Sequence, residues 1–177
     1  MDFSKKKYLE LMKESNKLRQ ETKFLWDYDK AKYDELSQYL TLLNDDIVWQ
    51  SRKEYLQILE LFISRSITVE EFIQQYGQLR RSNFEALKRR QKNLEAEAFA
   101  VLPKASEIGF QLNPQSSGFT EILSSIDSDI DLFDPDITLD MNLKHPELIG
   151  YGISEEFLRL DLKDNFLPRI GEYCKES

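Results

Sequence analysis

Apolar residues recur every three or four positions along most of the chain, which is the spacing of an amphipathic α-helix. This pattern predicts helices over residues 4–23 and 29–43, and a long helix from residue 68 to about 102 that ends near Pro103. Alternating runs bounded by glycine, which are typical of β-strands, do not stand out. We therefore expect an all-α fold, an antiparallel bundle of about five or six helices.

Two helix starts carry a capping-box pattern, a Ser or Thr followed three positions later by Glu. The boxes lie at residues 51–54 and 68–71. The second box is flanked by Ile67 and Phe72 at the two positions of a hydrophobic staple. These signals predict a helix–turn–helix whose connection covers residues 62–68.

The second half of the chain is harder to interpret. Residues 103–118 contain two prolines and two glycines and are predicted as a loop, followed by a short helix over 119–126. Ser154 is a candidate N-cap for the last helix, which is expected to fray near Pro168. Between these helices the chain is expected to be irregular.

Charge is unevenly distributed along the 177 residues, which carry 24 Lys and Arg, 32 Asp and Glu and a formal net charge of −8. Residues 1–104 hold 19 basic and 17 acidic residues, whereas residues 105–177 hold 5 and 15, a net charge of −10. The acidic segment, residues 121–140, has no Lys or Arg and contains seven acids: Glu121, Asp127, Asp129, Asp131, Asp134, Asp136 and Asp140. Such acidity disfavours nucleic acid as a direct partner.

Domain organisation and location follow from length and composition. We expect an N-terminal helical extension over residues 1–50 and a helical bundle over residues 51–177. One cysteine permits no internal disulfide, and the chain begins with no apolar run of signal-peptide length. A cytoplasmic protein that does not engage a membrane is therefore expected.

A basic cluster lies within the long predicted helix. The plainest interpretation is a solvated helical face or an internal counter-charge to the acidic segment. Its members are Arg80, Arg81, Lys88, Arg89, Arg90 and Lys92.

The sequence carries no recognisable motif of catalysis or cofactor binding. The chain has no phosphate-binding glycine loop, no nucleophile elbow and no Cys/His cluster, so we expect no enzyme and no cofactor. His145 is interpreted as an ordinary surface residue. Cys174 stands beside Glu172 and Glu176, which would not stabilise a thiolate.

Four interpretations of the acidic segment were weighed. Asp127, Asp129 and Asp131 imitate the start of an EF-hand loop, but Leu132 stands where that loop needs glycine and Thr138 where it needs glutamate. A catalytic carboxylate pair would require a substrate cleft that the segment does not indicate. A solvated loop remains open, beside the interpretation we favour: an acidic docking surface for a basic protein.

Three ordered motifs resemble the colicin D-type immunity proteins. The first is the helix–turn–helix opening at residues 61–72, followed by basic residues at 80–81. The second is the acid-x-Phe-acid-Pro-Asp stretch at residues 131–136. The third is the closing helix near residues 151–167. Together they span roughly residues 55–171.

The resemblance implies an all-helical inhibitor that binds a tRNA-cleaving bacteriocin ribonuclease and protects the producing cell. Its acids would occupy the basic active site in place of RNA phosphates. By position, the toxin-contacting acids correspond to Asp131 and Asp136, with Asp134 between them, and the neighbouring Asp127 and Asp129 extend the candidate surface. Phe133 would anchor it in the core.

Overall fold

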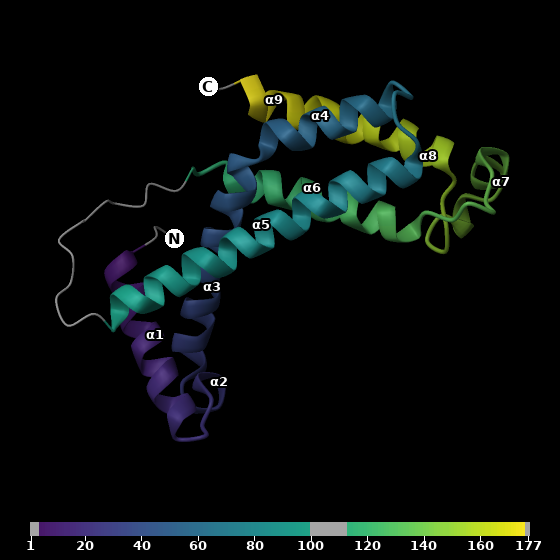
Figure 1. Ribbon diagram of the computed structural model, residues 1–177. Helices are drawn as coiled ribbons and strands as arrows, with labels where there is room; N and C mark the ends of the chain where they lie inside the picture. The colour runs from purple at the N-terminus through teal and green to yellow at the C-terminus, as the bar shows by residue number, and fades with distance from the viewer. Residues whose placement is uncertain (1–3, 100–112, 176–177) are drawn as a thin grey trace. The chain divides into compact units, whose positions relative to one another are not determined.

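A computed structural model describes residues 4–99 and 113–175 as α-helices joined by short connections, without an extended strand in those ranges (Figure 1). One isolated parallel bridge joins Phe133 and Ile153. The predicted all-α class is confirmed. The helices are α1 (Lys5–Gln20), α2 (Leu25–Tyr28), α3 (Lys30–Gln50), α4 (Arg52–Ile63), α5 (Val69–Ala98), α6 (Ser116–Leu132), α7 (Leu139–Lys144), α8 (Glu155–Asp161) and α9 (Leu167–Lys175).

The helices group into two compact units. The N-terminal unit consists of Met1–Ile47 with Asn83–Pro114, and the C-terminal unit of Val48–Ser82 with Gln115–Ser177. The first boundary falls three residues before the expected one at residue 50. Within the described residues, the second half of α5 groups with the N-terminal helices.

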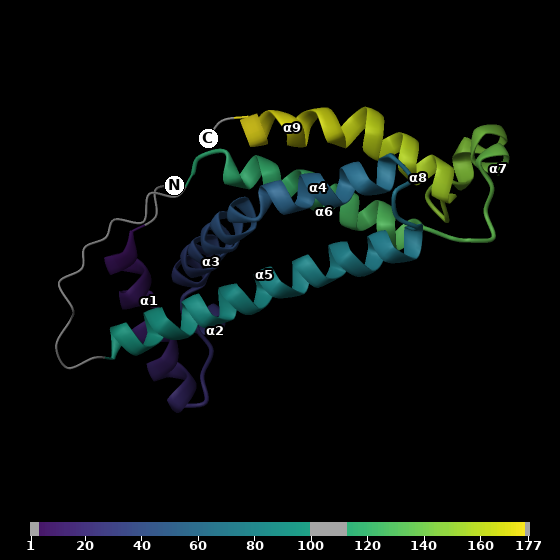
Figure 2. The same cartoon turned by 45° about the horizontal axis from the view of Figure 1, so that its top comes forward.

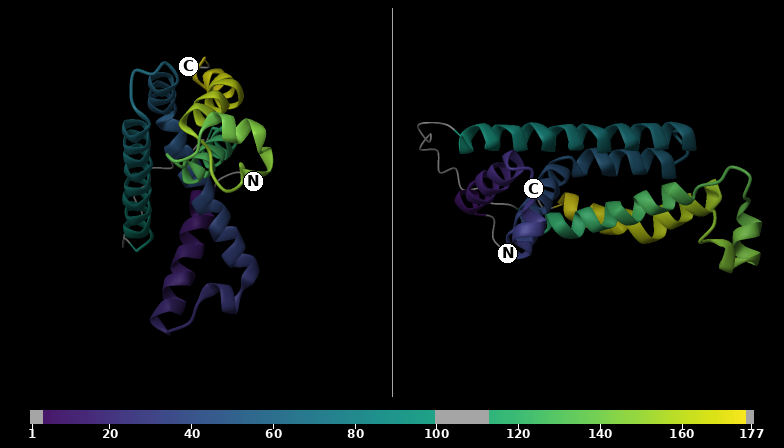
Figure 3. Two further views of the ribbon diagram at one scale, coloured as in Figure 1. Left: turned by 90° about the vertical axis from the view of Figure 1, so that its right-hand side faces the viewer. Right: turned by 90° about the horizontal axis from the view of Figure 1, so that it is seen from below.

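The N-terminal unit has its own apolar core. Helices α1 and α3 are joined through α2 (Figure 3). Their facing sides and the second half of α5 bury a stripe of large side chains, as the periodicity predicts. The fully or nearly fully buried members are Tyr8, Leu11, Leu25, Tyr39, Leu43 and Leu94. Tyr8 and Tyr39 meet edge to face at a centroid distance of 6.2 Å.

The core of the C-terminal unit is rich in aromatic rings. Helices α4 and α9 run side by side (Figures 1 and 2). The rings of Phe62 and Phe72 stack with centroids 4.3 Å apart, so the turn between α4 and α5 is closed by direct ring contact. The other large, fully buried side chains are Tyr55, Leu59, Phe119, Ile122, Leu123, Ile126, Ile153, Leu158, Leu162 and Ile170.

The helix starts were predicted with unequal success. At α5 the box is complete: the Thr68 amide donates to Glu71 Oε2 at 2.9 Å, and the Glu71 amide donates to Thr68 Oγ1 at 3.2 Å. Ser154 Oγ accepts from the Phe157 amide at 3.1 Å and caps α8 as expected. The box predicted at Ser51 is wrong, because φ −94° and ψ 13° do not give the extended backbone of an N-cap and the side chain makes no capping bond.

Replacing Thr68 by alanine is expected to lower the free energy of unfolding by about 1 kcal/mol, because the Glu71 amide loses its acceptor. Urea denaturation followed by circular dichroism measures this loss. The matched control is Thr41→Ala, an exposed threonine inside α3 where alanine is the better helix former. Equal effects at the two positions would contradict the capping role.

The lengths of the later helices differ from prediction. Helix α6 runs to Leu132 instead of ending near residue 126, because its buried stripe continues through the partly buried Ile130 with no glycine or proline to stop it. Helix α3 likewise extends to Gln50, and α5 ends at Ala98. The predicted end at Pro103 lies outside the described residues.

The C-terminal helix does not fray at Pro168. A π-helical segment, Leu162–Phe166, connects α8 to α9, and the chain stays helical to Lys175. Proline cannot donate a backbone hydrogen bond, and its ring crowds the carbonyl four residues earlier. The wider π turn just before Pro168 relieves both problems.

Candidate functional site

The acidic segment begins on a helix and ends in a fixed turn. After α6 ends at Leu132, Phe133 packs partly buried against the core. Asp134 Oδ1 then accepts a hydrogen bond from the Asp136 amide at 2.9 Å, and the Ile137 amide donates to the Asp134 carbonyl at 3.2 Å. Pro135, between them, restricts the backbone further. The turn therefore has a defined shape.

This turn is attached to the chain just before α8. The Asp134 amide donates to the Ile153 carbonyl at 2.9 Å, and the Ile153 amide donates to the Leu132 carbonyl at 2.8 Å. Gly152 lies so close to the turn that a Cβ there would overlap the end of the Ile137 side chain. Residues 132–137 and 152–153 thus form one packed unit.

Asn142, on α7, completes the attachment. Its side chain is 2% exposed and forms two hydrogen bonds. Nδ2 donates to the Gly152 carbonyl at 3.0 Å, and Oδ1 accepts from the Ser154 amide at 2.9 Å. One buried amide therefore holds the backbone on both sides of Ile153, next to the start of α8.

Asp127 is occupied by an internal partner. Its carboxylate pairs with the Arg80 guanidinium of α5, with Nη2 and Oδ2 at 2.5 Å. The Tyr76 hydroxyl donates to the Leu123 carbonyl at 3.2 Å, and burial together with the charge of Asp127 raises the pKa of Tyr76. Asp127 therefore belongs to the contact between α5 and α6 within the C-terminal unit.

Asp129 lies on a different side of α6, because two residues turn a helix by about 200°. It is half-buried beside Asp161. Burial, followed by a hydrogen bond to Asp161 and the charge of Asp161, raises the pKa of Asp129 from 3.8 to about 7. Near neutral pH part of the Asp129 population is therefore protonated. Asp129 then contributes less negative charge than an ordinary aspartate would.

Asp131 and Asp136 are exposed, and neither has an ion-pair partner in residues 4–99 and 113–175. Asp134 is half-buried, and one of its carboxylate oxygens is used in the turn. The exposed Asp140 pairs with Lys144 at 2.8 Å. Of the five predicted site residues, the structure therefore leaves two fully available carboxylates, Asp131 in the last turn of α6 and Asp136 within the fixed turn.

The helical placement of Asp127, Asp129 and Asp131 also bears on calcium binding. In an EF-hand loop the first acids converge on one ion. On α6 the middle carboxylate lies on another side of the helix from its two neighbours. Among the described residues, no group of three or more His, Cys, Asp or Glu side chains is placed to hold a metal ion.

Three members of the basic cluster form ion pairs with acidic residues of their own unit. Arg80 pairs with Asp127 as described, and Arg90 Nη1 lies 2.5 Å from Asp46 Oδ2 in the N-terminal unit. Lys88 pairs with Glu85 at 3.0 Å. The predicted counter-charge to the acidic segment is confirmed for Arg80, whereas Arg81, Arg89 and Lys92 are exposed.

Three contributors to the site were missed by sequence reasoning: Gly152, Asn142 and Asp161. Gly152 and Asn142 carry no local signal, because their role depends on chain segments that meet only in the fold. Asp161 lies on the helix predicted to begin at Ser154, but nothing in the sequence indicates that its carboxylate faces Asp129. The pKa of the Cys174 thiol is raised, first of all by burial, and neither Glu172 nor Glu176, on which the expectation rested, is a cause of the shift.

Within the described ranges, no helix is both long and apolar enough to cross a membrane. Comparison of the chain with protein-family models, with curated proteins and with solved structures finds no match in any of the three.

Proposed function

We propose that this protein is an immunity protein of the colicin D type. It binds a tRNA-cleaving ribonuclease toxin in the cytoplasm and blocks the toxin's basic active site with carboxylates that replace RNA phosphates. It acts by binding and not by catalysis, and it needs no cofactor. The observation that carries the proposal is the two exposed carboxylates without an ion-pair partner among the described residues, Asp131 at the end of α6 and Asp136 within the fixed turn.

The chemistry of the pair suits a nuclease cleft. A site that binds RNA attracts phosphates with Lys and Arg, and a carboxylate offers the same donors a charge-assisted acceptor without a bond to cleave. Among the described residues, Asp131 and Asp136 have no ion-pair partner that must be released before another protein binds. Their charge is therefore fully available for steering an encounter.

The attached turn supports the proposal in a second way. Ordering a loop upon binding costs free energy that weakens a complex. Here the hydrogen bonds to Ile153 and the buried side chain of Asn142 already hold the turn in the free protein. Asp134 contributes its backbone to this arrangement and leaves one carboxylate oxygen outside the turn hydrogen bond.

The proposal is tested with the charge-reversed double variant Asp131→Lys/Asp136→Lys, assayed with a colicin D-type toxin domain. We expect association to slow by about tenfold at low salt and protection in co-expressing cells to be lost. The rate difference should shrink as salt screens the charges. Surface plasmon resonance at two ionic strengths and survival of the co-expressing cells measure these effects.

The matched control is Glu54→Lys/Glu60→Lys, which changes the net charge equally at two exposed positions on α4. This control should bind and protect like the original protein. If the Asp131→Lys/Asp136→Lys variant does so as well, the acidic surface is not the toxin site and the proposal fails.

A second candidate function is a helical binding module for a different basic protein, working through the N-terminal unit. Three aromatic side chains around α2 are more than half exposed: Phe24, Trp26 and Tyr28. The exposed Asp27 lies among them, and the Phe24 and Trp26 rings lie 6.4 Å apart. Aromatic faces beside a carboxylate favour cationic side chains. Under this function, Trp26→Ser/Tyr28→Ser would abolish partner binding while the Asp131→Lys/Asp136→Lys variant binds normally.

A further inference from the structure

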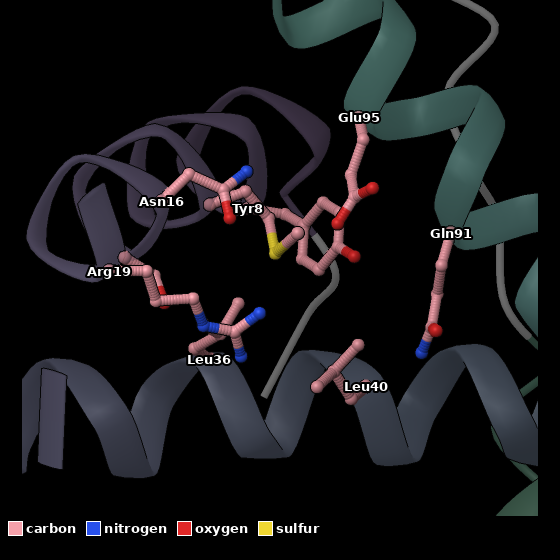
Figure 4. A pocket seen from close by; sticks show the side chains of 9 residues that line it. Tyr8, Asn16, Arg19, Leu36, Leu40, Gln91 and Glu95 are labelled. Carbon is pink, nitrogen blue, oxygen red and sulfur yellow. The ribbon is translucent and has the colours of Figure 1, made fainter. Parts of the chain in front are cut away.

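A cavity of about 160 Å³ lies in the N-terminal unit, between α1, α3 and α5 (Figure 4). At roughly 30 Å³ per water molecule, it has room for about five waters or a ligand of similar size. It is separate from the acidic segment, which belongs to the C-terminal unit. Its lining combines an apolar floor with several polar groups.

Two opposite charges line the cavity. Arg19 extends from α1 and Glu95 from α5, and in Figure 4 they approach it from opposite sides. Neither side chain forms an ion pair with another described residue. An arginine and a glutamate that share one cavity without pairing each remain able to bind a group of opposite charge on a ligand.

The remaining polar groups can orient such a ligand. Asn16 and Gln91 present side-chain amides, which both donate and accept hydrogen bonds. Burial, together with the charge of Glu95, raises the pKa of Tyr8 to about 12, so its hydroxyl remains a donor at neutral pH. Leu36 and Leu40 of α3 supply the apolar floor.

We propose that this cavity binds a small zwitterionic amino acid, with its carboxylate on Arg19 and its ammonium group on Glu95. The charges of the two side chains cancel, so a ligand with one group of each sign leaves neither charge unpaired. A simple anion would engage Arg19 alone and a simple cation Glu95 alone, with the unused side chain left hydrated, because Arg19 is exposed and Glu95 only half-buried. The volume restricts the ligand to the smallest members of the class.

Asn16 and Arg19 also line a wider hollow of about 430 Å³, and Arg19 is exposed to solvent. Gln20 and Phe99 line the outer part. A ligand can therefore enter beside Arg19 and does not require the helices to separate. A longer ligand has room in this outer hollow, so chain length tests the assignment.

The full-length protein is titrated with glycine, β-alanine and 4-aminobutanoate, which separate the two charges by increasing distances. Acetate, which carries only the carboxylate, and methylammonium, which carries only the ammonium group, are titrated for comparison. Isothermal titration calorimetry and amide chemical shifts are recorded at millimolar ligand. We expect at least one amino acid to bind at least tenfold more tightly than either half, with the largest shifts on α1 and α5.

Arg19→Gln and Glu95→Gln are each expected to weaken this binding by about tenfold or more, since each removes a charge-assisted hydrogen bond. Arg89→Gln and Glu10→Gln are the matched controls, because both are exposed residues on the same two helices that do not line the cavity. Circular dichroism confirms that each variant is folded.

Absence of binding by all three amino acids would overturn the proposal. So would binding that acetate reproduces and that Glu95→Gln leaves unchanged, because the site would then recognise an anion. Binding that survives both Arg19→Gln and Glu95→Gln would place the ligand elsewhere. Toxin protection is not part of this test, so its outcome is independent of the proposed immunity function.

Discussion

Asp129→Asn is expected to stabilise the protein at pH 8 by about 2 kcal/mol and at pH 5 by less than half as much. The raised pKa of Asp129, about 7 against 3.8, is worth about 4 kcal/mol at most, and we halve that value because the side chain is partly exposed. Asparagine cannot ionise and still offers a donor to Asp161. It should therefore resemble protonated Asp129.

The sign of the pH dependence follows from proton binding. Between about pH 4 and 7 the folded protein holds the Asp129 proton more strongly than the unfolded chain does, so the free energy of unfolding falls as the pH rises. Below that window the full contribution is present, and above about pH 7 no further loss occurs. The asparagine variant lacks this slope.

Thermal denaturation at pH 5 and pH 8 measures the effect, which corresponds to about 4–8 °C for a chain of this length. The matched control is Asp131→Asn, an exposed aspartate on the same helix, which should show no such difference between the two pH values. A stability gain for Asp129→Asn that is equal at both pH values would show that the half-buried carboxyl is not the cause.

Asn142→Ala is expected to lower the free energy of unfolding by about 3 kcal/mol. The substitution removes two hydrogen bonds and leaves the Gly152 carbonyl and the Ser154 amide without their buried partner. The attachment of the acidic turn should loosen as well. Amide hydrogen exchange at Asp134 and Ile153 should therefore accelerate more than exchange in the N-terminal unit.

Urea denaturation measures the loss of stability, with Asn93→Ala as control, since Asn93 is exposed on α5. In a toxin-binding assay, Asn142→Ala should weaken the complex although Asp131 and Asp136 are unchanged. A variant with original stability and slow exchange at Asp134 would show that the backbone contacts hold the turn without Asn142.

The fold could be predicted where one local rule decides the outcome. Thr68 with Glu71 and Ser154 cap their helices because a side chain three residues from an amide suffices. The rule failed at Ser51, where the chain passes from α3 into α4 without the extended backbone that a cap requires. The predicted fraying at Pro168 is wrong because the π-helical segment before it accommodates the proline ring, and no local sequence signal indicates that segment.

The candidate site was predictable as a segment but not as a set of residues. Composition locates the acids, whereas their roles depend on partners that are far away in sequence, such as Arg80 for Asp127 and Asp161 for Asp129. The length of α6 decides which acids share a side of the helix, and it was underestimated because the partly buried Ile130 was not included in the stripe. The toxin-binding role of Asp131 and Asp136 stays a prediction.

The residues that maintain the shape of the turn are different from the two residues that present free carboxylates, and this has a consequence for specificity. Asp134, Gly152 and Asn142 maintain the shape, whereas the side chains of Asp131 and Asp136 support no other described residue through an ion pair. Substitutions at those two positions can therefore alter which partner is recognised at little cost in stability. Under the proposed function, successive toxins can be matched by changing two surface side chains on an otherwise constant inhibitor.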